Sequence, residues 1–389
     1  MKKKTLLLLV PKLWLGGQER VAAKTAELLR NDCQVTLVVF DGADAVYHPD
    51  CEIIDLKIPA QDGTLHKIVN VFRRVRSMKR LRRERHADYV YSFGTTANLV
   101  NALSRGVGQT VIGLRGFLSV AAMGRADRYV FSHSDKIVAC AEAMADAIRH
   151  AYPQHREKVC CQYNPVDVEM ICQNGREPID DYAFSAHTVI SHGRLDSIKN
   201  WPRLINAFSL IRAKLPDAQL VIIGEGSERE ALERLIDGLG LRDSVRLIGF
   251  RANPFAYLAK ASLFVLPSYF EGFPNALVEG MVFLPVVSAD CKSGPREILS
   301  TGPVDRVAQG YEIADYGVLV QPASDRAFHA ELTRDDEILA EAMLRVLEDP
   351  ALSARLKAAA RRRAEDFSCE SYRAHLMKIL EEPVKGSCE

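Results

Sequence analysis

Short runs of apolar and β-branched residues alternate with helical stretches along most of this chain. In the first half, such runs lie at 5–10, 34–40, 51–56, 87–92, 109–114, 136–139 and 158–163. In the second half, they lie at 187–192, 218–223, 245–250, 261–266, 284–288 and 317–320. Strand-like runs joined by helical crossovers are typical of parallel sheets. The sequence therefore predicts an α/β fold built from Rossmann-like domains.

The domain organisation follows from length and composition. A chain of 389 residues, 48% of them hydrophobic, is large enough for two globular domains. The stretch 171–185 is rich in Asp, Asn, Gly and Pro, which is typical of a linker. We expect a first domain over 1–175 and a second over 186–367. Residues 368–389 are predicted to form a last helix and a tail, because apolar periodicity continues to Glu382.

The two halves of the chain carry opposite net charge. Residues 1–160 contain 25 Lys and Arg against 16 Asp and Glu, whereas residues 161–389 contain 26 against 34. Such asymmetry concerns partners rather than fold, and it points the N-terminal half toward something anionic.

Cysteine usage and the start of the chain bear on the compartment. The nine cysteines are odd in number, scattered and without a paired Cys-x-x-Cys spacing, which is typical of reduced cytosolic thiols. The apolar run at the N-terminus is cut by Pro11 and Lys12, so we interpret it as a first strand rather than a signal peptide. No run approaches the roughly 20 apolar residues of a membrane span. We predict a cytoplasmic protein whose only membrane association is peripheral.

The segment Lys67 to Arg85 is strongly basic and helical in pattern. One interpretation is a helix packed on the sheet with a solvated basic face. The other is a patch attracted to anionic headgroups or to a polyprenyl diphosphate, at about 1 kcal/mol per basic residue. Nucleic acid is disfavoured, because no aromatic platform or binding motif accompanies the segment. Its nine cations are offset by the single acid Glu84, and Ile68, Val71, Phe72, Val75, Met78 and Leu81 recur at helical spacing.

The segment Pro267 to Met281 sets two carboxylates, Glu271 and Glu279, eight positions apart. Pro274 suits a first helical position, so Glu271 is expected in the preceding loop and Glu279 within the helix. An all-helical spacing would separate them by about 12 Å, the scale of an extended nucleotide sugar. Alternatively, Glu271 is a solvated turn residue and Glu279 a surface helix residue. The backbone N–H groups expected to face an anion at this helix start are those near Phe273, Asn275 and Ala276.

Two further turns contain residues suited to phosphate. Gly16 and Gly17 follow the first strand and precede a helix, where glycine lets backbone N–H groups approach a phosphate, although an ordinary tight turn has the same pattern. Arg194 and Lys199 follow the strand 187–192, and two cations five positions apart suit a diphosphate. Generic surface charge would explain either cation alone.

These segments resemble the motifs of family 4 glycosyltransferases, which are retaining enzymes of the GT-B fold. The resemblance runs from Gly16 to about Glu382. It implies two Rossmann-like domains facing across a cleft, with a last helix, here 372–380, crossing back to the first domain. The Glu-Gly-Phe-Pro-Asn core is similar to the family's Glu, seven residues, Glu motif, in which the first Glu contacts the transferred sugar and the second the ribose. The donor-binding residues implied by this motif are Glu271, Gly272, Phe273, Pro274, Asn275, Ala276 and Glu279.

Other segments extend the resemblance. Gly16-Gly17-Gln-Glu-Arg is similar to a family turn beside the donor diphosphate, and Gly-Arg194-Leu followed by Lys199-Asn is similar to the pair that binds the donor phosphates. The turn starting at Arg251 matches one whose backbone meets the nucleotide base. Arg115, in a partial match, and Asn164, in an Asn-x-x-Asp turn, are candidate cleft residues. The run 290–297 is similar to a subset that builds bacterial cell-surface glycans.

The resemblance implies a hexosyltransferase with Glu271, Arg194 and Lys199 as its catalytic residues. It would move a hexose or N-acetylhexosamine from a nucleotide-diphosphate sugar, UDP by default, to a lipid-linked oligosaccharide of lipopolysaccharide, O-antigen or capsule assembly. The chain contains no Asp-x-Asp pair, so we predict no metal and no cofactor beyond the donor. Arg229 replaces the last glycine of a Gly-x-Gly-x-x-Gly fingerprint, which argues against NAD.

Two alternatives of other classes remain at this point. One is a catalytically idle nucleotide-sugar-binding scaffold, against which the intact Arg194, Lys199, Glu271 and Glu279 argue. The other is an epimerising or hydrolysing enzyme, which would need a water or base where the acceptor enters. Acceptor-dependent release of nucleotide distinguishes them.

Overall fold

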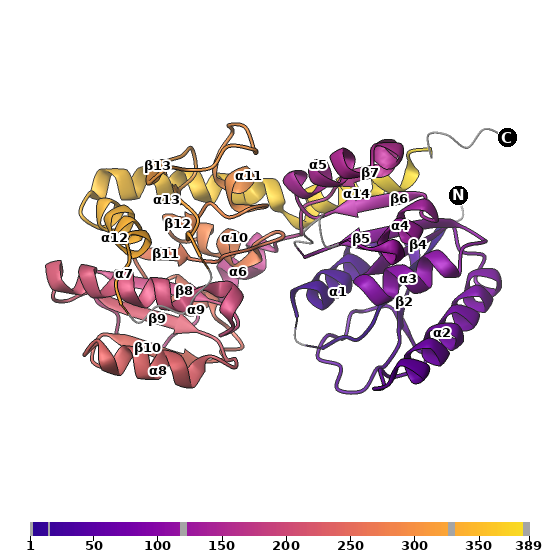
Figure 1. The fold of residues 1–389 in the computed structure, drawn as a ribbon, viewed down its shortest axis with the longest axis horizontal. Helices are drawn as coiled ribbons and strands as arrows, with labels where there is room; N and C mark the ends of the chain where they lie inside the picture. The colour runs from indigo at the N-terminus through magenta and orange to yellow at the C-terminus, as the bar shows by residue number, and fades with distance from the viewer. Residues whose placement is uncertain (1–2, 15, 117–122, 326–330, 384–389) are drawn as a thin grey trace. The chain divides into compact units, whose positions relative to one another are not determined.

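A computed structural model describes residues 3–14, 16–116, 123–325 and 331–383 (Figure 1). The chain divides into two compact units, which we call unit 1 (Met1–Pro165 with Cys369–Glu389) and unit 2 (Val166–Ser368). The break falls before the residue-175 boundary expected from composition. Helix α6 (Val168–Asn174) is the reason, because it packs against α9 (Phe255–Leu258) in unit 2.

Unit 1 contains a seven-stranded parallel sheet in the order β3-β2-β1-β4-β5-β6-β7. Its strand β1 (Lys4–Val10), which lies between β2 and β4, is buried on both faces. Leu6 and Leu8 pack with helices α1 and α14, whereas Leu7 and Leu9 pack with α2 and α3. The strands are β1 (Lys4–Val10), β2 (Cys33–Val39), β3 (Glu52–Asp55), β4 (Tyr89–Phe93), β5 (Gln109–Leu114), β6 (Lys136–Ala139) and β7 (Val159–Cys161). The helices are α1 (Gly17–Leu29), α2 (Thr64–Glu84), α3 (Thr95–Leu103), α4 (Arg125–Ser132), α5 (Glu142–Ala151) and α14 (Cys369–Glu381).

Helix α14 confirms the predicted return of the last helix to the first domain; it is the yellow helix beside β6 and β7 in Figure 1. The Tyr372 hydroxyl lies 2.7 Å from Thr25 Oγ1 in a buried hydrogen bond. Arg373 donates two hydrogen bonds of 2.6 Å to the carboxylate of Asp32. These contacts join α14 to α1 and to the turn between α1 and β2.

Unit 2 contains a second seven-stranded sheet, in the order β10-β9-β8-β11-β12-β14-β13. Its last strand, β13, is antiparallel to β14 and lies between the predicted runs 284–288 and 317–320, where no strand is expected from the sequence. A three-residue edge strand leaves too short a pattern to recognise. The strands are β8 (Thr188–His192), β9 (Gln219–Ile223), β10 (Val245–Gly249), β11 (Leu263–Leu266), β12 (Val286–Ala289), β13 (Tyr311–Ile313) and β14 (Val318–Val320). The helices besides α6 and α9 are α7 (Trp201–Lys214), α8 (Arg229–Gly238), α10 (Asn275–Met281), α11 (Pro295–Leu299), α12 (Arg334–Leu347) and α13 (Pro350–Ala364).

Helix α2 confirms the helical prediction for the basic segment, but only part of the apolar spacing, at Val75, Met78 and Leu81, packs on the sheet. Ile68 and Phe72, which share the apolar spacing, are largely exposed. Arg74 and Arg82 are buried instead, beside Met78. Among the described residues, no helix is both long and apolar enough to cross a membrane.

Candidate functional site

The carboxyl ends of β8 and β11 lie at the topological switch point of the unit 2 sheet, which is the edge where a ligand is expected. These strands are parallel neighbours, and the strand order runs outward from them in both directions. A crevice forms at such a switch point because the connections after the two strands leave toward opposite sides, and ligands of open α/β sheets bind there. Lys199 follows β8 in the one-turn helix η3 (Ser197–Lys199), and Glu271 follows β11. Topology therefore explains why residues 72 positions apart meet.

Lys199 and Glu271 form a partly buried ion pair at this edge. Lys199 Nζ donates to Glu271 Oε1 at 2.7 Å, and the two side chains are 17% and 10% exposed. Ser268 Oγ donates to the same carboxylate oxygen at 2.7 Å. The interpretation of Glu271 as a solvated turn residue is therefore wrong. Ser268 had not been predicted, although it lies in the same strand-to-helix segment.

Glu279 lies inside α10, which begins at Asn275 with Pro274 as its N-cap. The helix thus starts one residue later than expected. The side chain of Glu279 is buried, so its interpretation as a surface helix residue is wrong. Its Oε2 lies 3.1 Å from Nε2 of His192, the last residue of β8. Sequence reasoning missed His192, because only the pairing of β8 with β11 brings it to the helix.

The turn after β8 is held against the turn after β9 by backbone packing. Leu195 N–H donates to Glu225 O at 2.9 Å. A Cβ on Gly224 would lie 1.9 Å from the carbonyl oxygen of Gly193, and Gly224 has φ of +148°. Both observations require glycine at that position. The Gly-x-Gly turn thus serves close backbone packing beside Arg194.

The loop after β12 supports the loop that carries Glu271. Ser293 Oγ donates to Gly272 O at 2.9 Å. Gly294, at φ +89°, leaves room for Pro274, whose Cδ would lie 2.5 Å from an added Cβ. Glycine at this position therefore allows the two loops to pack closely.

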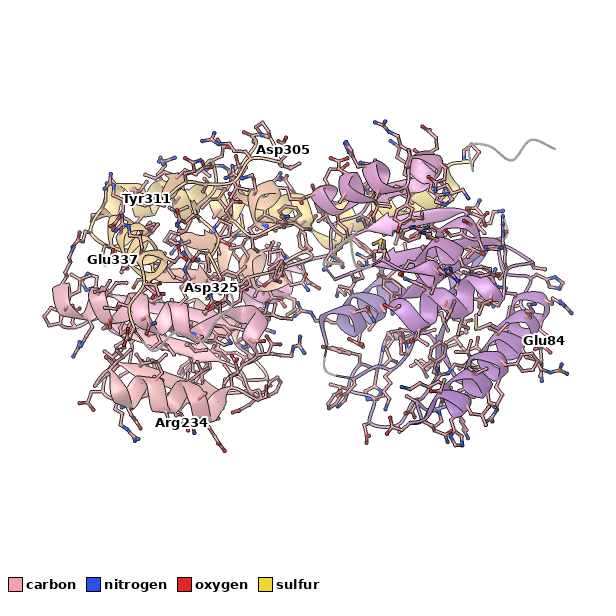
Figure 2. All side chains as sticks on the ribbon, viewed as in Figure 1. Glu84, Arg234, Asp305, Tyr311, Asp325 and Glu337 are labelled. Atoms are coloured by element: carbon pink, nitrogen blue, oxygen red, sulfur yellow. The ribbon has the colours of Figure 1, made fainter. Side chains whose placement is uncertain are left out.

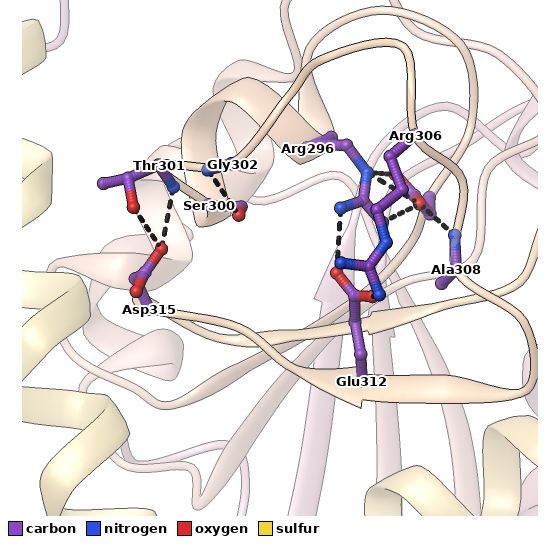
Figure 3. Close-up of polar contacts among 9 residues, drawn as sticks. Arg296, Ser300, Thr301, Gly302, Arg306, Ala308, Glu312 and Asp315 are labelled. Atoms are coloured by element: carbon purple, nitrogen blue, oxygen red, sulfur yellow. Dashed lines mark hydrogen bonds and ion pairs between the residues drawn. The ribbon is translucent and has the colours of Figure 1, made fainter.

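A buried ion pair between Arg296 and Asp290 closes the base of the loop after β12. Arg296 Nη1 lies 2.8 Å from Glu312 Oε1 on β13 (Figure 3). Asp290 Oδ2 also accepts the Ala308 N–H at 2.6 Å. These contacts of Arg296 and Asp290 hold the loop whose Ser293 hydroxyl donates to the Gly272 carbonyl oxygen.

Cys291 lies in the same loop as a buried thiol. Burial, and then the negative charge of Glu271, raises the pKa of this thiol well above its ordinary value. A thiol in that state is a poor nucleophile.

The other predicted donor-binding cations of unit 2 have partners of their own. Arg194 is mostly exposed and contacts Asp196 at 3.2 Å. Arg251 contacts Asp181 at 3.0 Å, and its Nε donates to the Tyr257 hydroxyl at 2.9 Å. Lys199 and Glu271 are thus brought together, whereas Arg194 and Arg251 are paired elsewhere in unit 2.

The predicted residues of unit 1 fall into two groups. Gly16 caps α1 after β1, and Gln18 Nε2 donates to Phe93 O, at the end of β4, at 3.4 Å. Strands β1 and β4 form the switch point of this sheet, so Gly16 and Gly17 lie where the topology rule expects a ligand.

Arg115 and Asn164 form the second group in unit 1, and they contact each other. Arg115 Nη1 donates to Asn164 Oδ1 at 2.8 Å, and Nη2 donates to the hydroxyl of Tyr91. The partial motif match thus corresponds to a real polar contact, although Tyr91 had not been predicted. Among the side chains that the structure describes, no three His, Cys, Asp or Glu residues group as a metal site would require.

Comparison with known protein families places both units. The model of Glycosyltransferase Family 4 matches residues 15–170, and the model of glycosyl transferases group 1 matches residues 185–363. The chain belongs to the family 4 glycosyltransferases. This confirms the resemblance inferred from its motifs and the GT-B fold that it implies.

The sequence of this glycosyltransferase aligns with two relatives over different shares of their length. It is 30% identical over 255 residues to an uncharacterized glycosyltransferase of Methanocaldococcus jannaschii, with 62% of each chain covered. It is 26% identical over 380 residues to the N-acetylgalactosamine-N,N'-diacetylbacillosaminyl-diphospho-undecaprenol 4-alpha-N-acetylgalactosaminyltransferase of Campylobacter jejuni, covering 94% of this chain and 96% of that one. The fold also matches Anabaena HepE in complex with UDP and glucose, with a TM-score of 0.73, 20% identity, and 98% and 100% of the two chains covered.

Proposed function

We propose that this glycosyltransferase moves a hexose or N-acetylhexosamine from a UDP-sugar to a lipid-linked saccharide, with retention of anomeric configuration and without a metal ion. The observation that carries the proposal is the Lys199–Glu271 pair at the switch point of unit 2. A cation and a carboxylate held 2.7 Å apart suit the two ends of a bond between a phosphate and a sugar. The Campylobacter jejuni relative, whose name gives a diphospho-undecaprenol-linked saccharide as acceptor, supports the acceptor class.

The proposed chemistry is a front-face displacement. The acceptor hydroxyl attacks the anomeric carbon on the face from which UDP leaves. The bond from that carbon to the β-phosphate oxygen breaks, the bond to the acceptor oxygen forms, and the departing phosphate takes the hydroxyl proton. Negative charge therefore grows on the diphosphate, where pre-placed donors contribute most to catalysis.

Lys199 and Arg194 are the proposed cations for the leaving diphosphate. Lys199 is already fixed, and Arg194, being exposed, can turn from Asp196 to a phosphate with little loss of packing. Two such cations would supply the positive charge that other transferases take from a divalent ion. This is the basis for proposing metal independence.

Glu271 and Glu279 are the proposed contacts for the sugar and the ribose. Lys199 and Ser268 both donate to Oε1 of Glu271, and among the described residues Oε2 receives no hydrogen bond. That oxygen is proposed to accept from sugar hydroxyls and to balance positive charge at the ring. Glu279, beside His192, is proposed to accept from a ribose hydroxyl.

A lipid-linked acceptor places the enzyme at a membrane. We propose cytoplasmic localisation with peripheral association through the basic segment Lys67–Arg85, whose exposed cations suit anionic headgroups. Nucleic acid is not proposed as a partner.

The test is acceptor-dependent release of nucleotide. The protein is incubated with a panel of UDP-hexoses and UDP-N-acetylhexosamines and with polyprenyl-diphosphate saccharides, and the anomeric configuration of the product is read by NMR. Lys199→Ala should lower turnover by a factor of about 10²–10³. Lys260→Ala, an exposed lysine of the same unit, is the matched control and should leave turnover unchanged. Tight UDP binding without release on any acceptor would instead favour the idle scaffold.

A further inference from the structure

The first turns of α2 carry an exposed apolar stripe. Leu65, Ile68, Val69 and Phe72 are 72%, 62%, 46% and 69% exposed. Their spacing of three, one and three positions puts them on one face of the helix. Single exposed apolar residues are ordinary, but a contiguous patch of four large ones marks a binding surface.

The opposite face of α2 is fixed to the sheet, so the stripe cannot turn inward. Arg74 Nη2 donates to Ile58 O at 2.7 Å, and its guanidinium lies over the ring of Phe40. Arg82 Nη1 donates to Val107 O at 3.1 Å. Burial lowers the pKa of Arg82 to about 10, which still leaves it charged at neutral pH. Two of the nine cations of the basic segment are thus structural anchors.

Cations continue the exposed face of α2 beyond the apolar stripe. At 100° per residue, Leu65, Phe72, Arg76 and Arg83 lie within about 40° of one another around the helix axis. Arg80 contacts Glu84 at 2.7 Å. The exposed cations that have no partner among the described residues are Lys67, Arg73, Arg76, Lys79 and Arg83. One face therefore changes from apolar to cationic along its length.

We propose that α2 binds an anionic membrane in two zones, with the apolar stripe inserted at the acyl boundary and the cations of the later turns among the headgroups. The inference rests on the proposed association with a membrane, and it names how that surface binds. Amphipathic helices insert by about 5–10 Å, which suits side chains of the size of Phe72 and Leu65. The rise from Phe72 to Arg83 is about 16 Å, which is long enough to separate the two zones.

Charge complementarity favours this occupant over a second copy of the chain. Parallel pairing of two α2 helices would set cations against cations, and antiparallel pairing would set the apolar stripe against the partner's cations. An anionic bilayer offers acyl chains to the stripe and phosphates to Arg76 and Arg83. Nucleic acid would offer phosphates to the cations but no apolar phase to the stripe.

The experiment measures co-sedimentation of the full chain with phosphatidylcholine vesicles, with and without phosphatidylglycerol, across a salt series. Leu65→Ser/Phe72→Ser tests insertion, and Phe250→Ser, a similarly exposed phenylalanine of unit 2, is its control. Arg76→Gln/Arg83→Gln tests the cationic zone. Its control is Arg234→Gln on α8, which Figure 2 labels together with Glu84 of α2.

The two zones predict different salt responses. The apolar variant should lose about a hundredfold or more in vesicle affinity at every salt concentration. The charge variant should lose about fivefold per cation at low salt and nothing at high salt. The controls should bind as the unchanged chain does.

Three results would overturn the inference. If the apolar variant binds vesicles as the unchanged chain does, α2 adsorbs by charge alone and its apolar stripe does not insert. If both variants bind unchanged, α2 is not the membrane-binding surface. Self-association in solution that Phe72→Ser abolishes would make the stripe an interface between copies. UDP affinity should be equal in all variants, because α2 is not part of the proposed donor site. Loss of vesicle binding with intact UDP binding tests the membrane inference alone, and loss of UDP binding with intact vesicle binding would concern the donor site alone.

Discussion

Replacing Lys199 by methionine tests whether the ion pair with Glu271 stabilises the fold as well as the reaction. Methionine keeps most of the side-chain length but removes the charge. Glu271 is then left nearly buried with only the Ser268 hydroxyl as a donor. Breaking a fully buried pair costs about 3–5 kcal/mol. Because both side chains keep some contact with water, we expect about 2–3 kcal/mol here.

That loss is large enough to measure without unfolding the protein at ambient temperature. For a domain of this size, each kcal/mol lowers Tm by about 2–4 °C, so Lys199→Met should lower the Tm of unit 2 by about 4–12 °C. Scanning calorimetry with and without UDP is the assay. Lys260→Met provides the control for removing an exposed lysine from the same unit.

The double variant Lys199→Met/Glu271→Gln separates stability from activity. Removing both charges leaves no unpaired ion, so most of the lost stability should return, with a coupling energy of about 1–3 kcal/mol. Activity should not return, because the phosphate cation and the sugar carboxylate are both gone. A Lys199→Met protein that melts like the unchanged chain would refute the ion pair in solution, and one with near-normal turnover would refute the phosphate assignment.

Three further predictions concern the loops and the chemistry around the pair. Gly224→Ala should cost about 2–4 kcal/mol in chemical denaturation, because its Cβ would clash with Gly193 O, whereas Gly238→Ala, whose Cβ meets nothing within 4 Å, should be neutral or stabilising. Cys291 should resist alkylation at neutral pH, since burial raises its pKa, and mass spectrometry should show it labelled later than Cys172; early labelling would contradict the buried position. Treatment with EDTA should leave turnover unchanged, and a loss restored by added Mg²⁺ would refute metal independence.

Sequence reasoning succeeded where local pattern determines structure. The seven strands of unit 1 lie within a residue or two of the predicted runs, because each run is a dense apolar segment between turn residues. Glu271 and Glu279 also fall where predicted, in the loop and in the helix, because Pro274 marks the boundary between them. The missed strand β13 is a three-residue edge strand, and its pairing with β14 is what makes it a strand.

The orientation of α2 could not be read from periodicity alone. The apolar set from Ile68 to Leu81 spans about half of the helix circumference. Only its inner part, around Met78, packs on the sheet, and Phe72 falls at the outer edge. Arg82 is buried because carbonyl oxygens of neighbouring segments accept its N–H groups, and those acceptors are remote in sequence. Arg82 is thus buried and Phe72 exposed because of contacts with segments that are remote in sequence, which the pattern of the helix alone does not predict.

His192, the partner of Glu279, was missed for the same physical reason, because it reaches α10 only once β8 and β11 are adjacent. Ser268 lies three residues from Glu271, so its contact is local, and no motif marked it. The loops after β9 and β12 hold the connections that follow β8 and β11 from either side. A site fixed by four backbone segments needs little rearrangement to bind, which is what electrostatic stabilisation of a transition state requires. The charge of Lys199 is meanwhile balanced by Glu271. An incoming diphosphate would therefore compete with Glu271 for the Lys199 ammonium. The Lys199–Glu271 contact thus both positions the carboxylate proposed to bind the sugar and limits how strongly Lys199 can bind the phosphate.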